Sequence, residues 1–232
     1  MPRFSVIVTA QSDADYLPYC LDSIARAAQT IVDAAPEEVC EIIVAAHRCD
    51  DATITLAHLM EAEAVEHHDG PVAAARNAAT AASTGDYIVH VDADCMLPIC
   101  ALSDIDQHLA DPLCVGGGAG FVPERRSLGI GLAVGVRRLG MAVTGLGGAL
   151  HWCRRDDFDA IEGFNDLLHV GEQSDFGRRL REHGRHSGRR YTNLVDTPVV
   201  VSSQRFDRYG DWHLLGSLTR RSAANDTLSS TN

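Results

Sequence analysis

Lysine is missing from this sequence of 232 residues, and all twenty basic residues are arginine. A lysine nucleophile, a Schiff base and the lysine of a phosphate-binding P-loop are therefore excluded. The seven cysteines are odd in number and scattered, and no C-x-x-C pair occurs, which argues against a disulfide framework or a zinc site. The chain begins with Met-Pro-Arg and a strand pattern, so we expect no signal peptide.

Positive charge is also scarce, because the formal net charge is −12. This balance argues against nucleic acid as a partner. Residues 128–150 are apolar and rich in glycine, but Arg137 and Arg138 lie in the middle of them. We therefore expect no transmembrane segment, and a cytoplasmic protein with at most a peripheral contact to a membrane.

Strand and helix patterns alternate through the first hundred residues. Buried-strand patterns cover residues 4–9, 41–45, 64–66 and 87–91, and helix patterns cover residues 16–28, 52–60 and 72–82. This alternation predicts a parallel sheet with right-handed crossovers. The second half is less regular, with strands expected at 113–122, 149–153, 190–194 and 199–203, and helices within 128–143 and at 172–182.

A run of three glycines, Gly116 to Gly118, interrupts one of these later strands. It does not fit a dinucleotide-binding motif, because Phe121-Val122-Pro123 follows where a helix should begin. The run instead predicts close approach of another backbone or of a ligand.

Two carboxylates follow the strand at 87–91 directly, and they are Asp92 and Asp94. Alternation along a strand places both side chains on one side, at the edge where open α/β sheets bind ligands. Two acids with no local partner repel each other, and a hard divalent cation with oxygen ligands offsets that charge. The spacing therefore predicts a metal site, although Asp-x-Asp alone is more often a solvated turn.

The order of the motifs resembles a family-2 glycosyltransferase with the GT-A fold, over about residues 3–185. The matching motifs after the first strand and helix are Cys49-Asp50-Asp51-Ala52-Thr53, Gly70-Pro71, Ala75-Arg76-Asn77, Gly85-Asp86-Tyr87-Ile88, Asp92-Ala93-Asp94, Gly163-Phe164-Asn165 and Gly171-Glu172 with Asp175, Arg179, Leu180 and Gly184.

This resemblance implies an α/β fold of the GT-A type, with a Rossmann-like, mostly parallel central sheet flanked by helices and an irregular C-terminal half on the acceptor side. It implies one domain over residues 1–218, with a nucleotide-binding half (1–97) and an acceptor-binding half (98–218). Residues 219–232 have few large apolar side chains and are expected to form a disordered tail.

The same resemblance implies a metal-dependent, inverting transfer of a sugar from a nucleotide diphosphate-sugar, with a UDP-sugar favoured. Asp92 and Asp94 would hold Mn²⁺ or Mg²⁺ against the diphosphate. The acceptor would be a small molecule, a lipid-linked molecule or a peptide. The oligomeric state stays open, a homodimer included.

The family supplies its general base at the start of the late helix, usually as Glu-Asp. Here the pair is Glu172-Gln173, and an amide cannot accept the proton. We therefore predict Glu172 as the base, with Asp175 as the second candidate. The alternative is that both acids only favour the positive end of the helix dipole.

Matching positions also give a set of residues expected to bind the nucleotide sugar. The set is Thr9, Ala10, Asp13, His47, Arg76, Asp92, Ala93, Asp94, His151, Trp152 and Arg205. Arg76 would offer a forked donor to phosphate or base, unless it is only a surface arginine. His151 and Trp152 would line the sugar or acceptor pocket, although isolated residues of these types more often pack in the core. Arg205 and Arg208 would close over the diphosphate or form a solvated basic patch.

Two departures leave other functions open. Ala46 stands where many family members have an Asp that binds the uracil edge, and Gln173 replaces the expected Asp. A catalytically degenerate nucleotide-sugar binder is therefore one alternative. A sugar nucleotidyltransferase is the other, but it requires a glycine-rich, basic first loop that Thr9-Ala10-Gln11-Ser12-Asp13 does not provide.

Overall fold

The computed structural model describes residues 2–31, 39–125, 127–132, 134–135, 146, 148–203, 207 and 210. Their strands form one eight-stranded sheet in the order β3-β2-β1-β4-β7-β6-β8-β5. The strands are β1 (Phe4–Ala10), β2 (Cys40–His47), β3 (Glu63–His67), β4 (Tyr87–Asp92), β5 (Cys95–Met96), β6 (Cys114–Pro123), β7 (Leu150–Arg154) and β8 (Arg190–Val201). The helices are α1 (Leu17–Ala28), α3 (Thr53–Leu59), α4 (Val72–Ala82), α5 (Ala101–Ala110), α7 (Arg155–Ala160) and α8 (Glu172–His186).

The first four strands are parallel, with β1 between β2 and β4. Every residue of β1 is buried, which matches its continuous run of apolar and small side chains. Beyond β4 the sheet is mixed, because β7 runs antiparallel to both β4 and β6, and β5 runs antiparallel to β8. The predicted α/β fold with a mostly parallel central sheet is confirmed.

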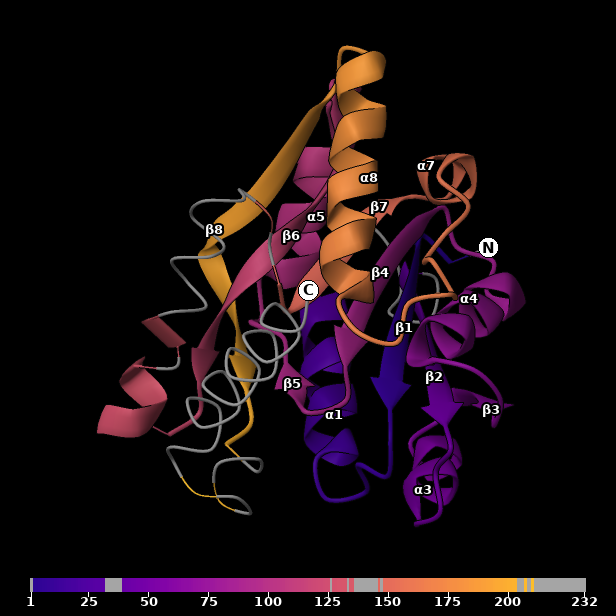
Figure 1. Ribbon diagram of the computed structural model, residues 1–232, viewed down its shortest axis with the longest axis vertical. Helices are drawn as coiled ribbons and strands as arrows, with labels where there is room; N and C mark the ends of the chain where they lie inside the picture. Colours follow the sequence, from indigo (N-terminus) through magenta and orange to yellow (C-terminus); the bar gives the residue numbers. More distant parts are fainter. Residues whose placement is uncertain are drawn as a thin grey trace, which may run out of the picture.

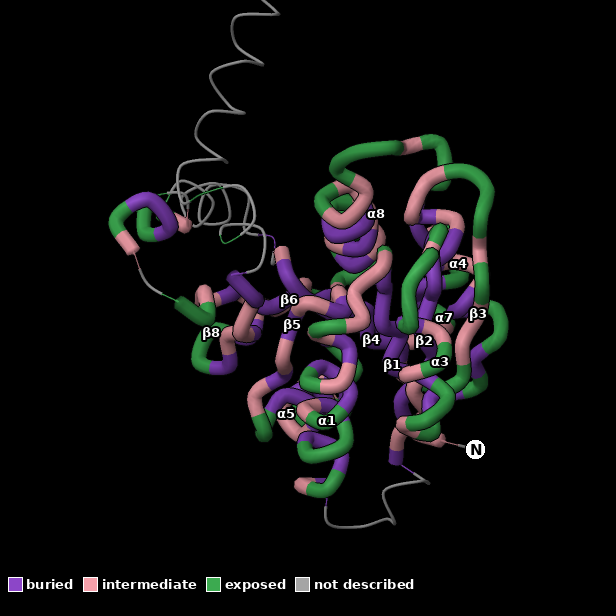
Figure 2. Tube along the Cα trace, turned by 90° about the horizontal axis from the view of Figure 1, so that it is seen from below, coloured by how far each residue is buried: buried purple, intermediate pink, exposed green. Residues whose placement is uncertain are grey.

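Helices cover both faces of the sheet (Figures 1 and 2). One core contains Phe4, Val6 and Val8 of β1 with apolar residues of α1 and α5. The other contains Ile7 of β1 with apolar residues of α4, α7 and α8. Alternate residues of one strand therefore serve two cores, as the two-residue period of a strand requires.

The C-terminal half differs from the sequence expectation in three places. Two short strands were expected over 190–203, but β8 runs unbroken from Arg190 to Val201. Pro198 is tolerated within β8 because β5 pairs with β8 only through Cys95 and Met96, opposite Val201 and Val200, which leaves Pro198 outside that pairing. Helices α5 and α7 were not expected, although the buried Leu102, Ile105 and Leu109 do recur at helical spacing.

The glycine run lies in β6, between β7 and β8. A Cβ on Gly117 would lie 1.6 Å from the backbone oxygen of Thr192 and 2.6 Å from the Trp152 ring. The glycines are therefore explained by the close approach of a neighbouring backbone, which was one of the two expectations for this run.

Within the described parts of the chain, no helix combines the length and apolarity that crossing a membrane requires. The expected disordered tail at 219–232, Arg205 and Arg208 lie outside the described residues, as does much of the helix expected within 128–143. The division of the domain at residue 97 stays a prediction.

Candidate active site

The loops after β1, β2 and β3 meet at one edge of the sheet, because these parallel strands end there. Gln11 Nε2 lies 2.9 Å from His47 Nδ1, and His47 Nε2 lies 3.2 Å from the Gly70 carbonyl oxygen. Burial lowers the pKa of His47, so the ring is neutral at neutral pH. His47 therefore joins the three loops.

Acids in these loops shape the backbone. Asp13 accepts the Gln11 N–H at 2.7 Å, and Asp51 accepts the N–H groups of Thr53 and Ala14. Burial works to raise the pKa of Asp51, but its hydrogen bonds from Thr53 and Ala14 outweigh that effect and lower the pKa overall. Both carboxylates help to fix the mouth of the site.

Asp92 is the last residue of β4 and pairs with Thr9 of β1. The next residue, Ala93, donates its N–H to the Thr9 carbonyl at 2.8 Å. The Thr9 hydroxyl is buried, and no described residue bonds to it. Ala10 is fully buried at the end of β1, so only its backbone is positioned to face a ligand at this edge.

Arg76 and Gln173 hold the carboxylate of Asp92. Arg76 Nη2 donates to Asp92 Oδ1 at 2.7 Å, and Gln173 Nε2 lies 3.1 Å from Oδ2. The Arg76 side chain is only 4% exposed, and its guanidinium carbon lies 5.3 Å from the centroid of the Phe164 ring. The guanidinium of Arg76 is thus buried against protein carboxylates, and its expected role as a donor to phosphate or base stays a prediction.

Glu172 is brought to the same cluster by the start of α8. Its Oε1 lies 3.9 Å from Arg76 Nη2, and its side chain is 13% exposed. Asp175, one turn later, accepts hydrogen bonds at 2.7 Å from both Arg178 and Arg179. Burial works to raise the pKa of Asp175, but these two arginines outweigh it and lower the pKa overall, which makes Asp175 the poorer base.

His151 and Trp152 point to opposite faces of the sheet. His151 lies opposite His90 of β4 and packs edge-on against Phe176, and no described residue bonds to either ring nitrogen. Burial lowers the pKa of His151 to about 4, and Arg76 lowers it as well. Trp152 is fully buried and stacks on His108, so the structure places it in the core and not beside His151.

The part of the chain from β1 into β6 matches a known protein family. A sequence model described as glycosyl transferase family 2 matches residues 5–121, just over half of the chain. The chain belongs to glycosyl transferase family 2. Among curated protein sequences, no significant match was found.

Three solved structures show the same fold as this family 2 chain. The S. aureus protein TarS, as a 1–349 fragment in complex with UDP-GlcNAc, has a TM-score of 0.66 at 16% identity over 87% of this chain and 58% of that one. The mannosyltransferase PcManGT from Pyrobaculum calidifontis, in complex with GDP-Man and Mn²⁺, has a TM-score of 0.63 at 23% identity over 86% and 56%. The M. tuberculosis glucosyl-3-phosphoglycerate synthase has a TM-score of 0.58 at 16% identity over 84% and 71%. The chain spans only 38% of the full TarS chain.

The fit of the family 2 site to a divalent cation depends on its carboxylates. No three His, Cys, Asp or Glu side chains in the described ranges are grouped to hold a metal. A cation that takes its remaining ligands from a diphosphate needs only one or two carboxylates. Asp92 and Asp94 are carboxylates of this kind, so the predicted pair fits such an ion. Asp92 is contacted by Arg76 and Gln173, and Asp94 accepts a hydrogen bond from the Cys95 thiol at 3.4 Å.

Two contributors to the family 2 site were not expected from the sequence. The Asn77 side chain donates a hydrogen bond to the Phe164 carbonyl at 2.8 Å and accepts one from the Phe164 N–H at 2.9 Å. These two bonds hold the Phe164 ring beside Arg76. Gln173 was read only as a lost carboxylate, but its amide contacts Asp92. The Asn77–Phe164 contact joins two motifs that the sequence does show, Ala75-Arg76-Asn77 and Gly163-Phe164-Asn165. The Gln173–Asp92 contact joins residues 81 positions apart, and no sequence pattern indicates it.

Proposed function

We propose that this chain is a glycosyltransferase that moves a sugar from a nucleotide diphosphate-sugar to a hydroxyl acceptor. One observation carries the proposal, and it is the placement of Glu172 at the start of α8 beside the Asp92 cluster at the end of β4. A carboxylate suited to accept a proton thereby lies next to the sheet edge where an α/β fold binds a nucleotide.

The reaction is a single displacement. The acceptor oxygen forms a bond to the anomeric carbon, and the bond from that carbon to the diphosphate oxygen breaks with its electron pair. The acceptor proton passes to the Glu172 carboxylate. Attack from the face opposite the leaving group inverts the anomeric centre. Arg76 supports this placement, because its guanidinium lies 3.9 Å from the Glu172 carboxylate and holds it beside the Asp92 cluster.

Asp94, with Asp92 beside it, would hold Mn²⁺ or Mg²⁺. When bound, such an ion neutralises the charge that develops on the leaving diphosphate. The loops after β1, β2 and β3 are proposed to bind the nucleoside through Thr9, Ala10, Asp13 and His47. Trp152 has no part in this proposal, and Arg205 stays a prediction from the sequence.

A UDP-sugar is the favoured donor, in line with the TarS fragment structures with UDP-GlcNAc and UDP. PcManGT holds GDP-Man, and Ala46 here provides no carboxylate for a uracil edge. Calorimetric titration of UDP, GDP and dTDP with Mn²⁺ present tests the base, and tightest binding of GDP or dTDP would contradict the UDP assignment. The cytoplasmic location, the homodimer and the kind of acceptor (a small molecule, a lipid-linked molecule or a peptide) stay predictions.

The function itself is tested by incubating a panel of nucleotide sugars with Mn²⁺ or Mg²⁺ and measuring released nucleotide diphosphate and transferred sugar. The unaltered chain should turn over one donor in a metal-dependent way. Asp94→Ala and Glu172→Gln should each lose turnover, and Glu172→Gln should keep donor binding. Turnover that is unaffected by both substitutions would refute this site.

A catalytically degenerate binder is the second candidate, and the Gln173–Asp92 contact favours it. In such a protein the donor would bind with metal but no acceptor would be glycosylated. Gln173→Asp restores the carboxylate that the family usually has. If the unaltered chain transfers no sugar and Gln173→Asp does, the result would support a catalytically degenerate binder. The family match argues against the nucleotidyltransferase alternative.

A further inference from the structure

Gln11 and His47 lie side by side where β1 and β2 end. The parallel register pairs Ala10 with Ala46, so the next residues along the two strands fall at the same level. Gln11 Nε2 lies 2.9 Å from His47 Nδ1, and His47 Nε2 lies 3.2 Å from the Gly70 carbonyl oxygen. A glutamine of the first loop is therefore linked through one imidazole ring to the loop before α4.

The direction of these hydrogen bonds follows from the chemistry of the partners. A carbonyl oxygen can only accept, so His47 Nε2 carries the proton that is donated to Gly70. Burial lowers the pKa of His47, and the neutral ring then has no proton at Nδ1. Nδ1 is therefore an acceptor, and the Gln11 amide must donate an N–H to it. These contacts fix which end of the Gln11 amide faces His47.

The amide oxygen is the part of Gln11 that remains for a ligand. Gln11 is exposed, and no described residue donates a hydrogen bond to its Oε1 atom. Its backbone N–H donates to Asp13 Oδ2 at 2.7 Å, so Gln11 is held at its main chain and at its side-chain nitrogen. Holding an exposed glutamine in this way costs side-chain rotamer entropy. An acceptor oxygen is thus kept in one orientation at the carboxyl edge of the sheet.

Gln11 and His47 are each followed by a residue with a left-handed backbone. The φ angle is 59° at Ser12 and 54° at Arg48, and such angles are unfavourable for residues other than glycine and cluster at ligand sites. The Arg48 guanidinium donates to the His68 carbonyl at 2.9 Å and to the Gly70 carbonyl at 3.1 Å. The carbonyl that accepts from His47 is therefore itself held in place.

This arrangement lies within reach of the proposed diphosphate position. Thr9, two residues before Gln11, pairs with Asp92 of β4. Because β1 lies between β4 and β2, the ends of β4 and β2 are about 10 Å apart at the usual strand spacing. A nucleotide with its diphosphate at the Asp92-Ala93-Asp94 turn can therefore place its base beside Gln11.

We propose that Gln11 recognises the base of the bound nucleotide by accepting a hydrogen bond from a ring N–H, and that His47 is the positioning residue that orients this amide. The base class is the one that uracil, thymine and guanine share. The ring nitrogens of cytosine and adenine carry no proton and would place one acceptor against another. The inference rests on the proposed function for the identity of its ligand.

The test combines one substitution with one change in the ligand. Calorimetry with Mn²⁺ present measures the dissociation constants of UDP, N3-methyl-UDP, GDP and N1-methyl-GDP for the unaltered chain and for Gln11→Met. The substitution should weaken the tighter-binding unmethylated nucleotide by about two- to tenfold, the effect of one hydrogen bond. Methylation should weaken binding more in the unaltered chain than in Gln11→Met, because the variant has no such hydrogen bond to lose.

Gln107→Met is the matched control. Gln107 is also exposed, but it lies on α5, which contributes no residue to the loops after β1, β2 and β3. This variant should bind all four nucleotides as the unaltered chain does. An effect of Gln107→Met equal to that of Gln11→Met would show that the loss is not specific to the nucleotide loops.

The positioning role of His47 is tested without any ligand. Nitrogen-15 NMR of the imidazole in the free chain should show the proton of His47 on Nε2. Gln11→Met should change the Nδ1 shift, because that atom loses its donor. His47→Phe should lose the discrimination against the methylated nucleotide, and a second substitution, Gln11→Met, should then add little.

A methylation cost that is equal in the unaltered chain and in Gln11→Met, or a His47 proton on Nδ1, would overturn the inference. The proposed function is judged separately, by turnover of nucleotide sugars. If the nucleotides bind with the expected coupling but no sugar is transferred, base recognition by Gln11 stands and the transferase function falls. If sugar is transferred without that coupling, the transferase function stands and this inference falls. Failure of all four nucleotides to bind would overturn both.

Discussion

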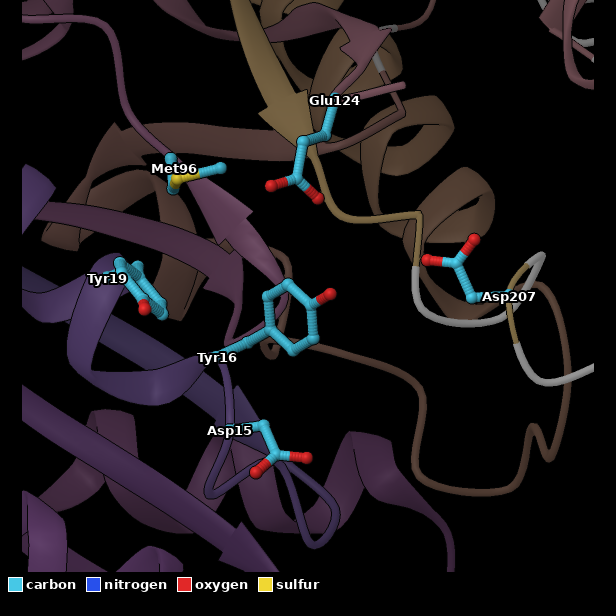
Figure 3. A pocket seen from close by; sticks show the side chains of 6 residues that line it. All are labelled: Asp15, Tyr16, Tyr19, Met96, Glu124 and Asp207. Carbon is cyan, nitrogen blue, oxygen red and sulfur yellow. The ribbon is translucent and has the colours of Figure 1, made fainter. Parts of the chain in front are cut away.

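The two sides of the Asp92-Ala93-Asp94 turn balance their charge in different ways. On the Asp92 side, the buried Arg76 lies 2.7 Å from Asp92 and 3.9 Å from Glu172, so a cation of the protein itself offsets part of the negative charge. On the other side, beyond Met96, Asp15, Glu124 and Asp207 are exposed and line a cavity together with Tyr16 and Tyr19 (Figure 3). The first region therefore holds its carboxylates through a buried arginine, whereas the second leaves its carboxylates exposed to solvent.

The largest effect is expected from Glu172→Gln, which keeps the shape of the side chain but removes the proton acceptor. Turnover should fall by about 10²- to 10⁴-fold, the usual contribution of a general base, while the donor dissociation constant stays unchanged. Steady-state kinetics together with calorimetric donor titration measure the two quantities.

Asp175→Asn is the matched comparison on the same helix. Asp175 is paired with Arg178 and Arg179, so Asp175→Asn should lower the unfolding temperature. It should change the turnover rate only slightly. A larger loss of turnover in Asp175→Asn than in Glu172→Gln would show that Asp175, and not Glu172, is the general base.

The support on the Asp92 side should also be sensitive to acid. His151 and His90 are buried next to each other, and burial lowers the pKa of both, of His151 to about 4. In the unfolded chain each ring takes up a proton near its ordinary pKa of about 6.5. The unfolded state therefore binds more protons between those values, and stability is lost as pH falls from about 6.5 toward 4.

For His151 alone the loss is about 3 kcal/mol of unfolding free energy. Urea unfolding at several pH values measures it, and His151→Gln should flatten the slope in this range. An unchanged slope in that variant would show that His151 is not held neutral in the fold.

Much of this architecture is local in origin and was predictable. The run in β1, the helix pattern of α4 and the turn before Tyr87 carry periods and turn residues that specify parallel strands with ligand loops at one edge. The partner of Arg76 was not predictable, because a forked donor suits a phosphate and a carboxylate equally well. The structure adds that the guanidinium is buried, 2.7 Å from Asp92 and over the Phe164 ring. The cavity likewise joins residues from the two ends of the chain.

Asp92→Asn and Asp94→Asn should separate the two sides of the turn. Asp92→Asn removes the charge that Arg76 faces at 2.7 Å, so it should cost about 1–3 kcal/mol of stability. Asp94→Asn should remove the effect of Mn²⁺ on UDP binding. Thermal unfolding and calorimetry with and without Mn²⁺ give both readings. Loss of the Mn²⁺ effect in Asp92→Asn alone would make Asp92 the principal metal ligand.

The smallest effect is expected at Gln173, whose amide lies 3.1 Å from Asp92. Gln173→Met removes the hydrogen bond without adding charge, and Gln173→Glu removes it and adds a second carboxylate. The Glu variant should be less stable than the Met variant by about 1 kcal/mol, a modest figure because Asp92 is partly exposed and solvent screens the repulsion. Urea unfolding at one neutral pH measures the difference. Equal stability of the two variants would mean that Gln173 does not face Asp92, and that the amide at this position marks a lost base and not a support for the site.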